Sequence, residues 1–95
     1  MSAGRPGPVE VVLYGAEDCS LCETAKATVR AVQRAAGFSL REVDIGDQAE
    51  LEARYRASIP VVEVDGVQAF ALHVPRPELE RWVSAAQARR SAARS

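Results

Sequence analysis

Two cysteines three positions apart, Cys19 and Cys22, constrain this chain more than any other feature. Residues 9–14, just before them, form a short and largely β-branched apolar run that ends at Gly15. Such a run is typical of a buried central strand. After the pair, apolar residues recur every three or four positions, which is the period of a helix that buries one face. The sequence therefore predicts that the cysteines lie where a strand gives way to a helix.

The helix after the cysteines has recognisable ends. Gly37 stands where a left-handed C-cap residue would end it. We expect Asp18, Cys19 or Ser20 to lie near its N-cap. The apolar stripe that should face the core consists of Leu21, Ala25, Val29, Val32 and Ala36.

Five further segments complete the predicted fold. A strand over 38–45 shifts its apolar phase midway, which predicts an edge position or a bulge. Residues 47–50 resemble a capping box and open a short helix in which Leu51 and Tyr55 face inward. The remaining segments are strands over 61–64 and 67–72, joined by a hairpin turn at Asp65-Gly66, and a last helix with Pro77 in its first turn.

The predicted order of elements is β-α-β-α-β-β-α. The first two strands are joined through a helix and should be parallel by a right-handed crossover, whereas the last two should form an antiparallel hairpin. The sequence therefore predicts an α/β domain with a four-stranded mixed sheet flanked by helices.

Length and charge exclude several classes of function. The chain has 95 residues, enough for one small domain, and 12 basic side chains against 13 acidic ones. This balance supplies no overall field to hold nucleic acid or an anionic membrane. No apolar run reaches the roughly 20 residues that cross a bilayer, and residues 1–8 lack the apolar core of a signal peptide. We expect a cytoplasmic, monomeric protein with neither nucleic-acid nor membrane partners.

The two ends of the chain differ in composition from the middle. We expect a flexible Gly/Pro-rich leader over 1–8, a folded domain over 9–86 and an Arg/Ala/Ser-rich tail over 87–95. The tail carries Arg89, Arg90 and Arg94, which we interpret as the solvated, fraying end of a helix.

The position of the cysteines at a helix start explains how they can react. The nucleophile in thiol–disulfide exchange is the thiolate, and the helix N-terminus stabilises it with unpaired N–H groups and partial positive charge. We expect Cys19 to attack a substrate disulfide and the more buried Cys22 to resolve the mixed disulfide. Carboxylates at Glu17, Asp18 and Glu23 oppose the thiolate, so the expected couple is reducing rather than strongly oxidising.

Two other interpretations of the cysteine pair stay open. The same spacing supplies half of many zinc sites, but a structural zinc needs four ligands, and here only His73 and carboxylates could complete the set. Two chains together could still hold a metal ion or an iron–sulfur cluster. Alternatively, the pair is buried in a redox-inactive adaptor. The favoured interpretation needs no metal and no cofactor beyond a redox-active disulfide.

Several short motifs in a fixed order give the chain a resemblance to a known family. Residues 9–83 resemble the thioredoxin-like superfamily and, within it, the small bacterial glutaredoxin-like proteins that have a Cys-x-Leu-Cys centre. The resemblance implies the thioredoxin-like fold and a dithiol–disulfide oxidoreductase. The motifs that carry it are Leu13-Tyr14 separated by four residues from Cys19-x-x-Cys22, Val43-Asp44-Ile45, and the run from Ile59-Pro60 through Val61-Val62-Glu63-Val64 to Asp65-Gly66.

The resemblance also implies roles for the residues around the dithiol. Pro60 would be a cis-proline that faces the cysteines and turns the backbone of Ile59 outward, freeing its N–H and C=O for an extended substrate. Ile59 and Ser58 would border the substrate groove. The active-site loop would consist of Asp18, Ser20 and Leu21.

The chain departs from the glutaredoxin pattern where glutathione binds. Ala16 stands where glutaredoxins carry a lysine, and residues 71–74 lack the Gly-Gly and acidic residue that follow the last strand. The cysteines enclose Ser20-Leu21 rather than Pro-Tyr. We therefore expect poor use of glutathione. The expected partners are a disulfide-containing protein or small thiol substrate, and a reductant that is either thioredoxin reductase or a low-molecular-weight thiol.

Two further side chains invite a functional role but are better explained without one. His73 follows the last strand and is expected on the surface. Trp82 lies on the apolar stripe of the last helix and is expected to pack in the core.

Overall fold

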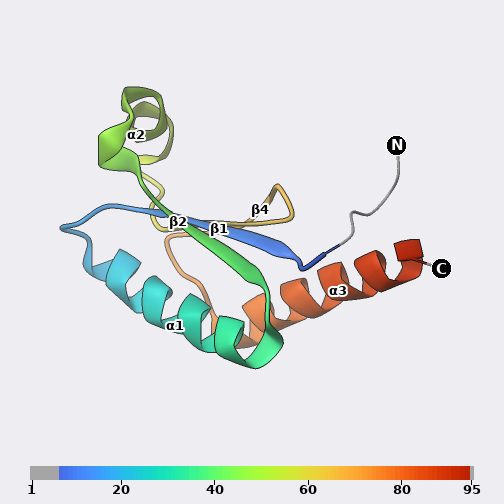
Figure 1. Cartoon of the computed structure of the whole chain (residues 1–95). Helices are drawn as coiled ribbons and strands as arrows, with labels where there is room; N and C mark the ends of the chain where they lie inside the picture. The colour runs from blue at the N-terminus through green and yellow to red at the C-terminus, as the bar shows by residue number, and fades with distance from the viewer. Residues whose placement is uncertain (1–6, 95) are drawn as a thin grey trace.

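The structure is a computed structural model that describes residues 7–94, so most of the expected leader lies outside the described residues. The order of elements is the predicted one (Figure 1). The strands are β1 (Glu10–Gly15), β2 (Ser39–Asp44), β3 (Val61–Val64) and β4 (Val67–Ala71); the helices are α1 (Ser20–Ala36), α2 (Ala49–Tyr55) and α3 (Arg76–Arg94), with a 3₁₀ turn at Ile45–Asp47.

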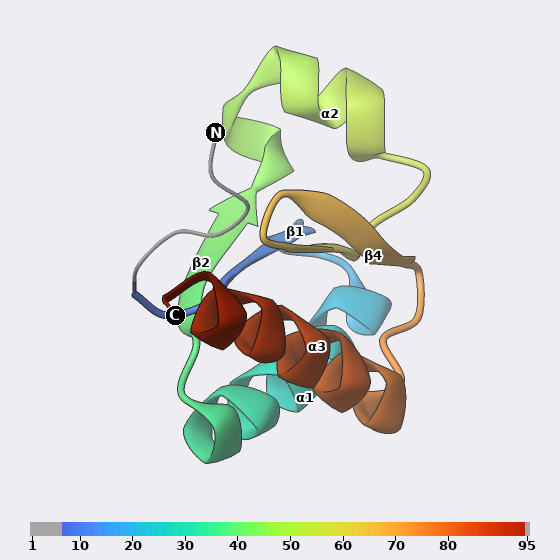
Figure 2. The same ribbon diagram turned by 90° about the vertical axis from the view of Figure 1, so that its right-hand side faces the viewer.

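The four strands form one mixed sheet in the order β2-β1-β3-β4. β1 pairs with β2 in parallel, and β3 pairs antiparallel with both β1 and β4. Helices α1 and α3 lie together on one face, and α2 lies on the other (Figures 1 and 2). The predicted α/β architecture is therefore confirmed.

The main core fills the space between the sheet and the α1–α3 layer. Alternate residues of β1, among them Val11 and Leu13, point into it, because successive side chains of a strand face opposite ways. The stripe predicted for α1 supplies Ala25, Val29 and Val32, all buried. From the last helix, the buried contributors are Leu79, Val83 and Ala86.

The second strand lies at an edge of the sheet, as its polar residues predict, and its pairing with β1 runs without a bulge. The register shift falls elsewhere, between Val62 and Glu63 opposite β4. The hairpin after β3 has the predicted tight turn, since Asp65 and Gly66 both adopt positive φ, 49° and 84°.

The capping box expected at residues 47–50 does not form. Gln48 is the N-cap of α2 and makes no capping hydrogen bond through its side chain. Instead, the Asp44 carboxylate accepts the amide of Gly46 at 2.9 Å and opens a 3₁₀ turn ahead of α2. Asp44 thus caps the 3₁₀ turn, and α2 begins without a side-chain cap. Tyr55 is buried and Leu51 half-buried, as predicted.

The expected solvated end of the last helix is wrong at Arg90. Helix α3 continues through most of 87–95, and Arg90 follows the buried Ala86 by four residues, which returns its side chain to the buried face. Its guanidinium donates to the Asp65 carboxylate at 2.6 and 3.1 Å and to the Gly7 carbonyl at 3.2 Å. Arg89 is exposed as expected, and the side chain of Arg94 lies outside what the structure describes.

Within residues 7–94, no helix combines the length and apolarity that a membrane span requires.

Candidate active site

The first cysteine of the pair is itself the N-cap of α1. Cys19 has extended backbone angles, φ −135° and ψ 106°, and its Sγ accepts the amide of Cys22 at 3.1 Å. This is the position in which the oxygen of a serine or aspartate side chain commonly accepts the free amides of a helix. The cysteine sulfur therefore lies where the unpaired donors of α1 converge, as the sequence predicts.

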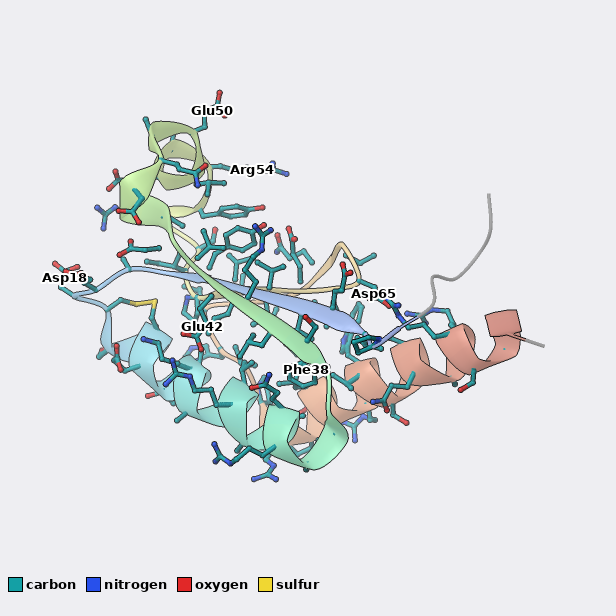
Figure 3. All side chains as sticks on the ribbon, in the orientation of Figure 1. Asp18, Phe38, Glu42, Glu50, Arg54 and Asp65 are labelled. Carbon is teal, nitrogen blue, oxygen red and sulfur yellow. A yellow bond between two sulfur atoms is a disulfide. The ribbon has the colours of Figure 1, made fainter. Side chains whose placement is uncertain are left out.

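The two sulfurs are joined in a disulfide, with the Cα atoms 5.2 Å apart. Figure 3 shows this bond at the start of α1, close to Asp18. Cys22 is 3% exposed, whereas Cys19 is partly exposed. The pair is thus asymmetric, with the first sulfur nearer to solvent and the second inside.

The close packing of Cys22 depends on Gly15, the last residue of β1. A Cβ atom at Gly15 would lie 3.3 Å from both Cβ and Sγ of Cys22. This is tighter than nine in ten such contacts, so a side chain there would require the Cys22 side chain to shift by a few tenths of an ångström. Gly15 therefore allows the second sulfur to sit directly against the end of β1.

The residues of the expected active-site loop lie at the surface. Asp18 and Ser20 are exposed, and Leu21 is 40% exposed, unlike the rest of the apolar stripe of α1. The expectation that Leu21 faces the core is therefore wrong; in the first turn of α1 it is Cys22, 3% exposed, that faces inward. An apolar side chain is left beside the disulfide.

The loop before β3 packs close to the cysteines. The Ile59–Pro60 peptide bond is cis, and Ile59 belongs to the same buried cluster as Cys22, while Pro60 is fully buried. Ser58 is half-buried, and its carbonyl, with that of Pro60, accepts the amide of Leu72 at 3.1 and 2.8 Å. These bonds tie the loop to the end of β4.

One expectation for this loop is corrected by its hydrogen bonds. The Ile59 N–H donates to the carbonyl of Tyr55 at 3.1 Å, so it is used within the fold rather than left free. The reason is that α2 ends immediately before this loop, and its last carbonyls take the next amides as partners.

A tyrosine pair beside the cysteines was not found from the sequence. The rings of Tyr14 and Tyr55 stack with their centroids 4.7 Å apart, and both hydroxyls donate to the Glu63 carboxylate at 3.3 Å. Burial first, and then the charge of Glu63, raise the pKa of both phenols. Because side chains alternate between the two faces of a sheet, the sequence indicates that Tyr14 and Glu63 can share one face. The position of α2 in the fold, which brings Tyr55 to them, has no such signal in the sequence.

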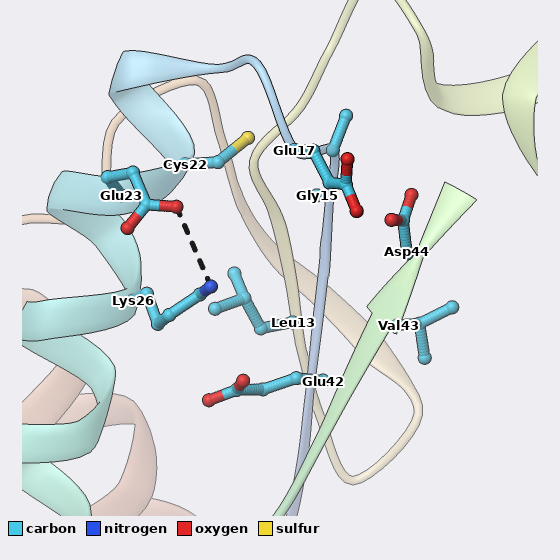
Figure 4. A pocket seen from close by; sticks show the side chains of 10 residues that line it. Leu13, Gly15, Glu17, Cys22, Glu23, Lys26, Glu42, Val43 and Asp44 are labelled. Atoms are coloured by element: carbon cyan, nitrogen blue, oxygen red, sulfur yellow. Dashed lines mark ion pairs between the residues drawn. The ribbon is translucent and has the colours of Figure 1, made fainter. Parts of the chain in front are cut away.

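A pocket of about 310 Å³ lies next to the second cysteine, between the start of α1 and the ends of β1 and β2 (Figure 4). Its apolar wall includes Leu13, Val43 and Cys22, and its charged groups include Lys26, which pairs with Glu23 at 3.6 Å. Other lining residues are Gly15, Ala16, Glu17, Glu42 and Asp44.

Arg30, on the outer side of α1, donates to both carboxylate oxygens of Glu42 at 2.7 Å. This pair holds the pKa of the Glu42 carboxyl below its usual range. The hydrogen bonds from Arg30 therefore favour the charged form of this carboxyl.

Neither His73 nor Trp82 belongs to the buried cluster around Cys22 or lines the pocket beside it. His73 is exposed, and Trp82 is half-buried, packing edge-on against Phe70 with 6.3 Å between ring centroids. Trp82 thus contributes to the core, as expected. In the part of the chain that the structure describes, no three His, Cys, Asp or Glu side chains gather as metal ligands.

Comparisons with known proteins agree with this geometry. Residues 10–84 match the family model described as "Glutaredoxin-like domain (DUF836)". A structural-genomics target protein from X. campestris, solved by X-ray methods, is 31% identical, with a TM-score of 0.66 over 79% of this chain and 96% of that one. No match is found among curated proteins.

More distant solved structures share the fold. The protein Ne2328 from Nitrosomonas europaea is 23% identical, with a TM-score of 0.68 over 84% of this chain and 96% of that one. A mutant thioredoxin from Halobacterium salinarum is 15% identical, with a TM-score of 0.65 over 83% of this chain and 74% of that one. With its Cys-x-x-Cys disulfide at the start of α1, the chain therefore belongs to the glutaredoxin-like domain family and has the thioredoxin-like fold.

Proposed function

We propose that this protein is a thiol–disulfide oxidoreductase that uses the Cys19–Cys22 pair. The observation that carries the proposal is the capping geometry of Cys19. The residue is partly exposed and its sulfur already accepts the amide of Cys22 at 3.1 Å, so a thiolate formed there by reduction would find a donor in place. Cys22 is 3% exposed and its sulfur is bonded to that of Cys19, so it lies within reach of Cys19 as a resolving cysteine must.

The reaction of the reduced protein with a substrate disulfide balances as follows. The Cys19 thiolate attacks one substrate sulfur, forms a mixed disulfide and releases the other sulfur as a thiolate. Cys22 then loses its proton and attacks Cys19 Sγ, which releases the second substrate thiolate. Two electrons pass from the protein to the substrate, and the Cys19–Cys22 disulfide remains. The two released thiolates become thiols by taking up the proton lost by Cys22 and one proton from solvent, which replaces the proton that Cys19 gave up when its thiolate formed. An external dithiol or two thiols must reduce it again.

Substitution of each cysteine tests this assignment of roles. Cys19→Ser should abolish reduction of a substrate disulfide, because no attacking sulfur remains. Cys22→Ser should instead accumulate a mixed disulfide at Cys19, visible as a mass increase that disappears with reductant. As a control, a lone cysteine placed at the exposed Ser84 of α3, in a variant lacking both native cysteines, reports ordinary thiol reactivity. If Cys19→Ser kept the wild-type rate, the proposed mechanism would be wrong.

We further propose that glutathione is a poor reductant of the oxidised protein. Ala16 lines the pocket beside Cys22 and offers no charge to a glutathione carboxylate, and the lining is mainly acidic. A thioredoxin-reductase system should therefore reduce the disulfide faster than glutathione at matched reducing equivalents. Rapid and saturable reduction by glutathione would contradict this.

The rival interpretation, a metal or cluster carrier, is tested in the same preparations. Protein purified under reducing conditions would then carry about half an equivalent of metal per chain, if two chains supply four thiolates. Elemental analysis together with a thiol count distinguishes this outcome from a free dithiol.

A further inference from the structure

Exposed carboxylates surround the proposed redox centre on its solvent side. Glu17, Asp18 and Glu23 are all exposed and lie within four residues of a cysteine of the pair. The nearby ammonium of Lys26 is paired with Glu23 at 3.6 Å. A substrate approaching Cys19 therefore meets negative charge first.

The pocket beside Cys22 continues this charge into the molecule (Figure 4). Four carboxylates and one ammonium line it. Arg30 neutralises Glu42 from outside the pocket and Lys26 offsets Glu23. Among the residues that the structure describes, Glu17 and Asp44 have no ion-pair partner, although Asp44 accepts the amide of Gly46. Two carboxylates thus remain for a cation that enters.

The shape and the apolar parts of the same region fit a long basic side chain. Leu13 and Val43 form an apolar wall, and lysine and arginine pack their methylene stems on such surfaces while their charged ends reach polar groups. Leu21, 40% exposed between the cysteines, offers a second apolar contact at the disulfide itself. The site therefore combines an apolar wall with an acidic end.

On the basis of the proposed function, we infer that the preferred substrate is a protein or peptide disulfide with a lysine or arginine next to the reacting cysteine. While the substrate cysteine is joined to Cys19, the neighbouring basic side chain enters the pocket beside Cys22 and lies between Glu17 and Asp44. The exchange steps are those given above, and the pocket contributes only charge and shape. Complementary charge raises the association rate of oppositely charged partners and excludes like-charged ones.

Two synthetic peptide disulfides test the inference. They are identical except that lysines flank the cysteine in one and glutamates in the other. The reduced protein should reduce the lysine peptide with a kcat/KM roughly 10-fold higher or more at low salt. The ratio should fall toward 1 at about 0.5 M salt, because salt screens exposed charges. An uncharged aromatic disulfide serves as a third substrate.

A pair of matched variants locates the effect. Glu17→Gln with Asp44→Asn removes two charges from the pocket, and each new side chain keeps a carbonyl oxygen that can accept a hydrogen bond. Glu78→Gln with Glu80→Gln removes two charges from α3 instead. The first variant should lose most of the preference for the lysine peptide, taken as the ratio of the two peptide rates, so that a change in thiolate reactivity common to all substrates cancels. The second should behave as the wild type on all three.

The outcomes separate this inference from the proposed function. If the uncharged disulfide is reduced but the two peptides react equally, the inference is overturned and the proposed function stands. A preference that both double variants lose equally also overturns it, since net charge would then be the cause. If no disulfide is reduced at all, the proposed function fails and the inference fails with it.

Discussion

Arg90 links three parts of the chain that are far apart in sequence. It lies near the end of α3 but is only 7% exposed, and it bonds to Asp65 in the β3–β4 turn and to the carbonyl of Gly7. Asp65 also accepts the amide of Glu10 at 2.9 Å. A single guanidinium thus fastens the last helix to the hairpin and to the residues before β1.

Removal of Arg90 should destabilise the fold. Arg90→Ala breaks a nearly buried, bidentate ion pair and leaves the Asp65 carboxylate poorly compensated, which we expect to cost about 2 kcal/mol. The free energy of unfolding from urea titration measures this. Arg89→Ala, one residue away and exposed, is the matched control and should leave the urea midpoint unchanged. Equal midpoints for the two variants would show that the pair contributes nothing.

The tyrosine pair predicts a specific loss of stability in alkali. The pKa of Tyr14 and of Tyr55 is raised in the folded protein, by burial first and by the Glu63 charge second. A group with a raised folded pKa stabilises the fold fully below its unfolded pKa, which is about 10 for tyrosine, and loses that contribution as the pH rises through the folded value. Stability should therefore fall above about pH 9 to 10.

Replacement of one phenol tests this directly. Tyr14→Phe keeps the stacked ring but has no proton to lose, so its stability should fall less steeply with pH than that of the wild type. Urea midpoints from neutral to alkaline pH, alongside an ultraviolet titration of the phenolates, give the comparison. Parallel curves for the two proteins would contradict the assignment.

Local features of single residues were predictable, and long-range partners were not. The site at Cys19 and Cys22 could be predicted because the strand, the turn and the helix that form it follow one another directly in the sequence. The Arg90–Asp65 pair escaped because its members lie 25 positions apart. Only the packing of α3 against the sheet brings them together, and surrounding Ala and Ser residues gave no local sign of burial.

The helices show how ends are decided by individual contacts. The start and end of α1 were predicted closely, since Gly37 adopts φ 79° and its N–H donates to the Gln33 carbonyl at 2.8 Å. The side-chain cap predicted for α2 at Asp47 is absent, because Asp47 ends a 3₁₀ turn over Ile45–Asp47 and α2 begins after Gln48. The side-chain cap that forms is that of Asp44, which accepts the amide of Gly46 and opens the 3₁₀ turn.

Substitution of the residue that ends α1 should separate backbone strain from packing. No atom lies within 4 Å of a Cβ built on Gly37, so a side chain there meets only the strain of a positive φ. Gly37→Ala should lower the free energy of unfolding by about 1 kcal/mol, whereas Gly37→Asn should cost less, because asparagine tolerates this conformation. Urea unfolding of both variants measures the difference. Identical losses would mean that strain is not the cause.

At the scale of the whole molecule, the two faces of the sheet are unequally covered. Helix α1 buries four residues against the sheet, whereas α2 buries only Tyr55. The fold could be predicted because its larger layer follows clear apolar periods. The smaller layer is a single short helix, whose inward residues Leu51 and Tyr55 were predicted but whose contacts with Tyr14 and Glu63 were not.

This inequality predicts where the molecule opens first. Segments with few buried apolar contacts exchange their amide hydrogens at lower opening free energies than the core. Hydrogen exchange followed by mass spectrometry should therefore show faster exchange in α2 than in the middle of α1. Tyr55→Ala should speed exchange in α2 with little change in α1. Uniform protection of both helices would contradict a weaker second layer.

The sulfur that begins α1 is also the sulfur proposed to react, and this joins two equilibria. Reduction puts negative charge on an atom that already accepts the Cys22 amide, and a charged acceptor forms a stronger hydrogen bond than a neutral one. Winding of the first helical turn and uptake of electrons therefore belong to one thermodynamic cycle. A contact that stabilises this turn therefore favours the reduced protein, and a contact that destabilises the turn favours transfer of the electrons to the partner.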